Sequence, residues 1–293
     1  MPFISASAIS SYNSIRGGAE GGLVPLLLDL YPNAAAAYSL RKLRTAYSGP
    51  AIEARKTVGG ETFVQDIGFV DNELDTASLL TFADGGDVFV AKWYDQSGNE
   101  NNDVVQVSES AQPKIVSLGN LVEENGKPSI YFDGNVNLQS LNNTNYGTSS
   151  RSLFLSSKLD GVNPLIGIIS LSNSATGNGT IWVITPEIAT RTGNYTWISS
   201  TELPSTNLSL LSNIYTSGQL FEGNSIWLNG NDVVRTSGVN GPINTSIGKL
   251  TVGGNGLGSN ATAFISEFIA YQSDQSANKE AIENNINTHY TIY

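Results

Sequence analysis

Short apolar runs separated by turn-forming residues dominate the chain from residue 87 onward. The runs are rich in Val, Ile, Leu and aromatic residues, and Gly, Asn, Asp and Ser lie between them. Evenly spaced short strands without intervening helices are typical of antiparallel sandwiches and jelly rolls. The hairpin signal is strong at Asn229-Gly230, because these residues tolerate positive φ between two apolar runs. The pattern therefore predicts an all-β, antiparallel jelly-roll β-sandwich.

A few segments have a helical pattern instead. Residues 34–50 (AAAAYSLRKLRTAYSGP) predict a helix that ends at Gly49, and its apolar face carries Leu40, Leu43 and Tyr47. Residues 51–55 then alternate like a strand.

Two more helices are predicted from capping signals. Residues 75–86 predict a short helix with Asp75 as N-cap and Gly85 at its end. A C-terminal helix is predicted after Ser276, which we expect to cap it. This helix has an apolar stripe and should lie across the sandwich; the stripe consists of Ile282, Ile286 and Tyr290.

Residues 1–35 are the least regular part of the chain. They are rich in Ser and Gly and include the apolar run LVPLLLDLYP at 23–32. Left exposed, such a run would be an aggregation liability. Either it packs on its own domain, or it forms an attachment arm that docks on a partner. We expect an N-terminal attachment arm over 1–35 and a single lectin-like sandwich over 36–293.

Composition excludes several function classes. The chain has no cysteine, so disulfide scaffolds, thiol nucleophiles and iron–sulfur sites are ruled out. Its net charge is −11 without a basic run, and no nucleic acid or membrane partner is expected. Only 14% of residues are charged, against roughly 25% in typical globular proteins. This surface-type composition, without a secretion signal at the N-terminus, favours a virion component assembled in the host cytoplasm. The alternative is an extracellular or cell-surface protein.

The stretch WYDQSGN at 93–99 follows a strand-like run. Alternation predicts that Trp93 shares one face of this strand with Phe89 and Ala91. The next residues look like a turn in which Asp95 bonds to backbone N–H groups and Gly98 takes positive φ.

The same turn offers oxygen ligands at Asp95, Ser97, Asn99 and Asp103. A structural turn is the favoured interpretation, but two alternatives remain open. Asp95 and Asp103 are weak candidates for a Ca²⁺ site, although the spacing does not fit an EF-hand. Asp95 and Asn99 are candidates for ligand contact. No other cofactor is expected.

Catalysis by this composition would have to use carboxylates, as in glycoside hydrolysis. Acids near predicted strands are Asp95, Glu187, Glu222 and Glu267. His289 is the only histidine, which argues against a Ser-His-Asp triad or a multi-histidine metal site. The tryptophans could stack on sugar rings, but apolar strand runs favour core positions; they are Trp93, Trp182, Trp197 and Trp227.

Three stretches resemble the catalytic domain of α-L-arabinofuranosidase B. They are AYSLRKLRTAYSGPAIEARK at 37–56, WYDQSGNENNDVVQ at 93–106 and LTVGGNGLGSNATAFISEFIAYQSD at 250–274. The resemblance implies a concanavalin A-like sandwich and a retaining glycosidase ancestry. The resemblance covers both ends of residues 36–293, while the sequence between them has diverged from the family.

The resemblance also implies that catalysis is lost. The family's acid/base aspartate lies in a GGDN-type stretch, and the best match here has Asn255, which cannot donate and recover a proton. The family's D-[LM]-E-N-like stretch, which carries its nucleophile, has no counterpart in 180–225. Its adjacent cysteine pair is absent as well. Glu187 and Glu267 remain as weak catalytic candidates, and Asn255 as a ligand-binding candidate.

From these observations we expect a non-catalytic bacteriophage virion protein that decorates head or tail. Its lectin-like domain would contact host-surface glycans, and its arm would contact other virion proteins. A homo-oligomer, dimer or trimer, is expected. The alternatives are a divergent arabinofuranosidase-like hydrolase and a bacterial carbohydrate-binding adhesin module.

Overall fold

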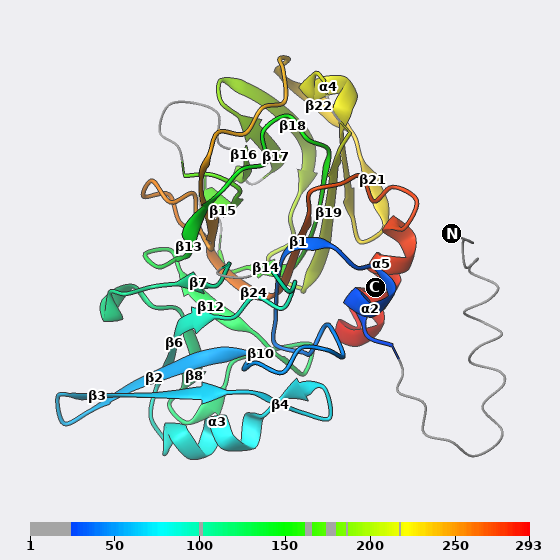
Figure 1. Ribbon diagram of the computed structural model, residues 1–293. Coiled ribbons are helices and arrows are strands. Elements are labelled where there is room, and N and C mark those ends of the chain that lie inside the picture. The colour runs from blue at the N-terminus through cyan, green and yellow to red at the C-terminus, as the bar shows by residue number, and fades with distance from the viewer. Residues whose placement is uncertain (1–24, 100–101, 162–165, 174–179, 186, 217) are drawn as a thin grey trace, which may run out of the picture.

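The computed structural model describes residues 25–99, 102–161, 166–173, 180–185, 187–216 and 218–293. Strands dominate this part of the chain (Figure 1). Most of them join one antiparallel sheet of 20 strands, which folds over into the layers of a sandwich. The predicted all-β, antiparallel sandwich with a few short helices is thus confirmed. Within the described ranges, every helix is too short or too polar to cross a membrane.

The first layer is built around strand β24 (Thr262–Tyr271). β14 pairs along one edge of β24, while β1 and β12 share the other edge. The layer continues from β14 through β19, β20 and β21. The bounds are β1 Ala34–Ser39, β12 Ile130–Asp133, β14 Arg151–Leu159, β19 Ser209–Tyr215, β20 Asn224–Leu228 and β21 Asn231–Val233.

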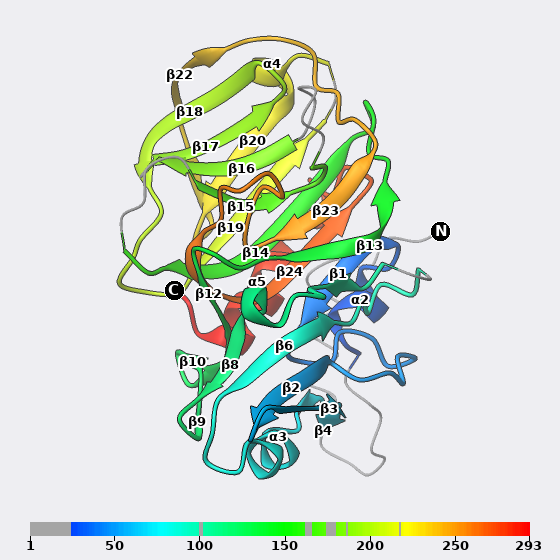
Figure 2. The same cartoon turned by 90° about the vertical axis from the view of Figure 1, so that its left-hand side faces the viewer.

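The second layer runs in the order β22-β18-β17-β16-β15-β23-β13 and faces the viewer in Figure 2. Its strands are β13 Leu138–Thr144, β15 Ile166–Ser170, β16 Thr180–Thr185, β17 Glu187–Thr192, β18 Tyr195–Glu202, β22 Arg235–Val239 and β23 Gly248–Val252.

From β13 the sheet continues through β7, β6, β2 and β3 below the sandwich (Figure 2). β8 pairs with both β6 and β12 and so joins the layers. These strands are β2 Ile52–Val58, β3 Glu61–Ile67, β6 Val88–Trp93, β7 Val104–Val105, β8 Lys114–Ser117 and β9 Asn120–Leu121. Smaller elements are α2 Leu27–Leu30, β4 Phe69–Val70, β5 Glu73–Leu74, α3 Thr76–Ala83, the 3₁₀ turn Glu109–Ala111, β10 Glu123–Glu124, β11 Lys127–Pro128, α4 Leu220–Gly223 and α5 Lys279–Tyr290.

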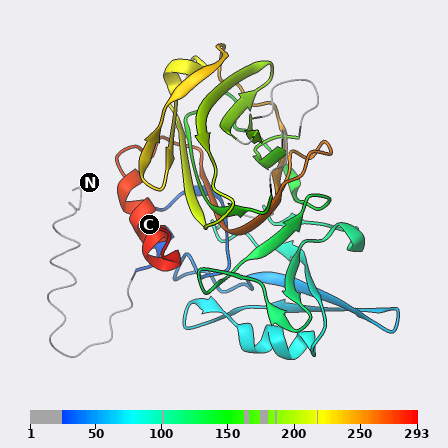
Figure 3. The same ribbon diagram turned by 180° about the vertical axis from the view of Figure 1, so that it is seen from behind.

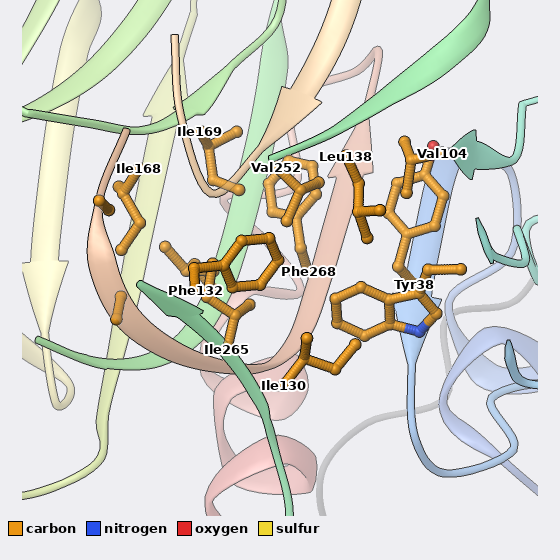
Figure 4. Packing of buried hydrophobic residues seen from close by; sticks show 14 of the residues in the cluster. Tyr38, Val104, Ile130, Phe132, Leu138, Ile168, Ile169, Val252, Ile265 and Phe268 are labelled. Carbon is orange, nitrogen blue, oxygen red and sulfur yellow. The ribbon is translucent and has the colours of Figure 1, made fainter. Parts of the chain in front are cut away.

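The main core lies between the layers. Figure 4 shows the inward side chains of β12, β13, β23 and β24 packed on one another; they include Phe132, Leu138, Val252, Ile265 and Phe268. Each of these five side chains is fully buried. On β24, Ala263 and Ile265 alternate on the core face before an irregularity at Ser266, and Phe268 and Ala270 alternate on it afterwards.

Helix α5 covers the outer face of the first layer (Figure 3). Every residue of β19 is buried, because one of its faces meets the main core and the other lies under α5. The helix stripe of Ile282, Ile286 and Tyr290 packs there on Phe154 and Ile269, as expected. The predicted cap is wrong. Ser276 donates its hydroxyl to Asp274 instead, and the helix starts after Asn278.

Two local predictions are confirmed, although the left-handed C-cap of the first helix is Asp84 rather than the predicted Gly85. The Asp75 carboxylate accepts the backbone N–H of Ser78 at 3.0 Å and caps α3, which ends at Ala83. Asn229 and Gly230 both have positive φ, 51° and 75°, and connect β20 to β21. In both cases the signal is local, because a few neighbouring residues determine the backbone geometry.

The predicted helix over 34–50 is wrong. Residues 34–39 form strand β1, because the edge of β24 offers backbone partners to this alanine-rich segment. Tertiary pairing overrides the helix propensity of alanine. Leu40 and Leu43 are buried, but as parts of a loop.

The prediction that Trp93 shares one face of β6 with Phe89 and Ala91 is wrong. Trp93 is fully buried, but Phe89 and Ala91 are only half-buried, while Val88 and Val90 point inward. The pairing of β6 with β2 shifts at Ala91. Lys92 pairs with Glu53 and Val90 pairs with the next residue, Ala54, so Ala91 is the extra residue of a bulge. This bulge reverses the alternation, so Trp93 joins the face of Val88 and Val90.

The described part of the predicted arm packs on the sandwich. Leu27 and Leu28 of α2 are buried in a cluster with α5, whereas Leu30 is exposed. The boundary expected between residues 35 and 36 falls inside β1. Residues 1–24 of the predicted arm lie outside the described residues.

Candidate functional site

The WYDQSGN stretch forms a hydrogen-bonded corner against β1. One oxygen of Asp95 accepts the backbone N–H of Ala37 at 2.7 Å and that of Ser97 at 3.0 Å. The other oxygen accepts the Ser97 hydroxyl at 2.5 Å. The N–H of Asp95 in turn donates to Asp103 at 3.0 Å. Asp95 therefore holds both its own turn and a strand 58 residues away.

Gln96 and Gly98 complete this corner. The side-chain oxygen Oε1 of Gln96 accepts the N–H of Leu43 at 2.8 Å, and its side-chain Nε2 donates to the backbone carbonyls of Ser39 and Arg41, each at 3.0 Å. Gly98 has φ of 93°, and a Cβ there would overlap the guanidinium of Arg44. Gln96 was not among the predicted site residues, although it lies inside the WYDQSGN motif.

The electrostatics of the corner do not fit a calcium site. Burial raises the pKa of Asp95 to about 6, although its hydrogen bonds to Ser97 and Ala37 favour the charged form. Its oxygens are occupied by N–H and O–H donors, and Asp103 accepts a backbone N–H. Among the described residues, no group of three or more His, Cys, Asp or Glu side chains is arranged to hold a metal ion.

Glu267 is fully buried in an ion pair. Its Oε2 accepts from Nε of Arg41 at 2.8 Å, and its Oε1 accepts from Nη2 at 3.0 Å. The Ser39 hydroxyl donates to Oε2 at 2.7 Å. Burial alone would raise the pKa of Glu267. The charge of Arg41 and these hydrogen bonds lower it by more than burial raises it, so the net pKa lies below the ordinary value. Both oxygens are thus used to join β24 to the loop after β1.

Asn255 lies in the loop between β23 and β24. Its side-chain oxygen accepts the N–H groups of Leu257 at 2.8 Å and Ser259 at 3.0 Å. This amide therefore organises its own loop, and it packs close to Gly167 of β15. Its role as a ligand-binding residue stays a prediction.

Glu187 stands at the start of β17, directly opposite Glu202 of β18. Side chains that face each other across antiparallel strands have Cβ atoms about 4.5–5.5 Å apart. Glu187 is half-buried and Glu202 is exposed. Glu187 was a predicted candidate acid, whereas Glu202 was not.

A pocket of about 380 Å³ opens beside the corner. Its wall is made mainly of amide side chains, with small residues of β1 and one tyrosine; the lining residues are Asn33, Ala34, Ala35, Asn99, Asn102, Thr144, Asn145, Tyr146 and Gln272. We call it the amide pocket. Of the predicted ligand-contact residues, Asn99 lines it. The high Asn content of the whole chain gave no signal for the other amides.

Backbone contacts orient the amides of this pocket. The Asn99 amide group donates to the carbonyl of Ala34 at 2.9 Å, and that of Asn102 donates to Ala35 at 2.8 Å. Gln272 likewise donates to the Asn145 carbonyl at 2.9 Å. Because each NH₂ group is held by the backbone, the paired amide oxygen is left as an acceptor. Such a wall suits ligand hydroxyl groups.

The remaining candidates have structural surroundings. Trp93 is fully buried and Trp197 is 3% exposed, whereas Trp227 is half-buried. The side chain of Trp182 lies outside the described residues. Burial lowers the pKa of His289 to about 3, so this histidine is neutral at pH 7. It packs edge-on against Tyr290.

No protein-family model and no curated protein matches the sequence. Among solved structures, an arabinofuranosidase complexed with arabinofuranosyl-α-1,2-xylobiose matches with a TM-score of 0.59 and 14% identity. A GH54 α-L-arabinofuranosidase soaked with a cyclic sulfate inhibitor matches with a TM-score of 0.58 and 15% identity. Each match covers 86% of this chain but only 62% of the enzyme chain. The predicted concanavalin A-like, arabinofuranosidase-like sandwich is therefore confirmed as a fold.

Proposed function

We propose that this chain is a non-catalytic carbohydrate-binding protein on the surface of a bacteriophage particle. The observation that carries the non-catalytic part is Glu267, whose two oxygens are held by Arg41 in the fully buried ion pair. An acid in such a position cannot reach a substrate. Asp95 is similarly held in its corner, and the position that matches the family's acid is an asparagine, Asn255.

The amide pocket supports glycan binding. Its volume lies near the lower end of the roughly 300–1,000 Å³ range of small-molecule sites. Fixed amide acceptors can pair with sugar hydroxyls, and a lining without charged side chains suits an uncharged ligand. The fold shared with an arabinofuranosidase makes a sugar the natural ligand class.

Glycan binding is tested on an array of neutral and acidic oligosaccharides. We expect the purified protein to bind at least one glycan without releasing a sugar from it. The double variant Asn102→Ala/Gln272→Ala should lose this binding. Asn231→Ala changes an exposed asparagine at the start of β21; it is the matched control and should bind normally. Binding that survives the double variant would refute the role of the amide pocket.

The particle context rests on composition. A low charge content and a net charge of −11 suit an exposed polar β-protein that does not bind nucleic acid. We expect the full chain to be found in purified particles by mass spectrometry, and a variant lacking residues 1–24 to be absent from them. Normal incorporation of the truncated protein would contradict the attachment arm. Light scattering on the purified chain would test the proposed dimer or trimer.

One observation favours a hydrolase as the second candidate function. Glu187 and Glu202 are directly paired across β17 and β18, and retaining glycosidases use two carboxyl groups roughly 5–5.5 Å apart. Release of arabinose from an aryl α-L-arabinofuranoside, lost in Glu187→Gln and in Glu202→Gln, would support this function over the first. Activity unaffected by both changes would exclude this pair.

A further inference from the structure

Arg151 is a fully buried arginine at the start of β14. It pairs with Tyr215 of β19, and Leu153 and Leu155 follow it at two-residue spacing on the face that meets the main core. Paired and alternate residues share one face of an antiparallel sheet, so the Arg151 side chain points into the space between the layers. The protein therefore buries a guanidinium inside its sandwich.

One edge of this guanidinium has no protein partner. Its Cζ lies 4.9 Å from the centroid of the Tyr215 ring, and Nη1 donates to the backbone carbonyl of Gly147 at 3.4 Å. Nε and Nη2 of Arg151 are buried and have no hydrogen-bond partner among the residues that the structure describes. These two nitrogens form one edge of the planar group, and their N–H groups run parallel, which suits a pair of oxygens.

Arg41 shows how the same edge is used elsewhere in this chain. Its Nε and Nη2 donate to the two carboxylate oxygens of Glu267, at 2.8 Å and 3.0 Å. Arg151 is more deeply buried than Arg41, yet it makes no ion pair within the described ranges. Of all the acidic residues in the sequence, only Glu20 and Glu100 lie outside those ranges.

The polar groups next to Arg151 do not supply a negative charge. Burial raises the pKa of Tyr215 to about 12, although Thr190 and Arg151 lower it, so its hydroxyl is neutral at pH 7. Burial also raises the pKa of Tyr146, which is neutral for the same reason. Asn224, the partner of Tyr215 on β20, is an uncharged amide. Burial lowers the pKa of Arg151, but arginine stays protonated in proteins, so its charge remains.

A buried charge needs compensation. Moving an ion out of water costs more than stacking on one aromatic ring returns, and buried charges in proteins are accordingly paired. A buried water molecule can accept the free N–H groups, but it does not neutralise the charge. An anion with two oxygens does both, in the geometry that Glu267 provides for Arg41.

We propose that a small carboxylate-type oxyanion, such as formate, binds inside the sandwich to Nε and Nη2 of Arg151. A planar anion with two oxygens matches this edge of the guanidinium better than a spherical halide does. Because Arg151 is fully buried, the site takes a small ion rather than a sugar acid or a phosphate ester. Arg151 does not line the amide pocket, so the proposal does not depend on glycan binding.

Tyr146 places this site close to solvent. It is 3% exposed and lines the amide pocket, and the carbonyl that accepts from Nη1 of Arg151 belongs to the next residue, Gly147. The guanidinium therefore lies close to this wall of the pocket. A small ion needs only a brief opening of the wall to reach it.

The test measures anion binding through stability. Urea unfolding of the full chain is followed at rising sodium formate, with sodium chloride keeping the ionic strength constant. We expect a saturable stabilisation of the wild type. A formate concentration of ~100 Kd should raise the ratio of folded to unfolded protein about 100-fold. Saturation-transfer NMR from the protein to the formate proton gives a second measurement that needs no variant.

Three variants locate the site. Arg151→Met should remove the formate effect, which also corrects for any general effect of the salt on unfolding. Lysine keeps the charge but has no planar fork, so Arg151→Lys should weaken formate binding at least 10-fold. Arg235→Met changes an exposed arginine and should keep the wild-type response.

Two results would overturn the proposal. One is a wild type that shows neither saturable stabilisation by formate nor saturation transfer to it. The other is an equal formate response in Arg151→Met or, if that variant does not fold, in Arg151→Lys. An acid outside the described ranges would give the first result if it were the counter-ion, and Glu20→Gln or Glu100→Gln would then acquire the formate response that the wild type lacks.

Discussion

Replacing Glu267 by glutamine should strongly destabilise the protein. The side chain of Glu267 is fully buried and that of Arg41 is 11% exposed, so the change leaves a nearly buried positive charge without its partner. The glutamine NH₂ group would also face an Arg41 N–H donor, because both carboxylate oxygens now accept from this arginine. Removing one member of a buried ion pair typically costs about 3–5 kcal/mol.

Equilibrium urea unfolding and calorimetry measure this cost. A loss of about 3–5 kcal/mol corresponds to a fall in Tm of roughly 6–20 °C for a large domain. Glu61→Gln is the matched control, because Glu61 is exposed on β3, and it should change the free energy of unfolding by less than about 0.5 kcal/mol. The double variant Arg41→Met/Glu267→Leu should recover much of the lost stability, since an apolar pair needs no charge compensation.

The pH dependence gives an independent check. The folded-state pKa of Glu267 lies below its ordinary value of 4.5, so its stabilising contribution is present above pH 4.5 and is lost as pH falls through the folded pKa. The difference between wild type and Glu267→Gln should therefore shrink in acid. A loss below about 1 kcal/mol at pH 7 would refute the structural role of this pair and reopen a catalytic role for Glu267.

Further predictions concern the corner, a loop and a helix cap. Gly253→Ala should destabilise the protein by roughly 2 kcal/mol or more, because φ is +81° and the new Cβ would overlap the Phe132 ring. Urea unfolding measures this loss, and an unchanged free energy of unfolding would mean that the loop adapts freely. Asp75→Ala should cost about 1 kcal/mol through loss of the bond to Ser78, whereas Asp75→Asn should retain most of it. The raised pKa of Asp95, about 6 against 3.8, means that its folded form binds the proton more tightly, so wild-type stability relative to Asp95→Asn should fall by about 1–3 kcal/mol as pH rises from 4 to 7. A rise over this range would show that its hydrogen bonds outweigh its burial.

The elements that the sequence predicted correctly depend on nearby residues. Asp75 caps α3 through a residue three positions away, and Asn229-Gly230 closes its hairpin through its own backbone angles. The stripe of α5 follows from helical spacing alone. Regular short strands likewise indicated the sandwich, because alternation places apolar side chains on one face of each strand.

The elements that the sequence did not predict depend on distant partners. The alanine-rich segment became β1 because β24, more than 200 residues later, offered an open edge. The face of β6 depended on a bulge against β2. Local patterns carry no information about such pairings, so the helix over 34–50 and the Phe89/Ala91 face were predicted wrongly.

The same division applies to the candidate sites. By itself, the sequence determined a strand-rich chain without cysteine, with a motif around Asp95 and an asparagine at 255. Only the tertiary structure decided that Glu267 meets Arg41 across 226 positions, and that amides from separate segments line one pocket beside Asn99. The physical reason is that charge compensation and cavity shape arise from side chains brought together by folding, and their positions along the chain do not encode those distances.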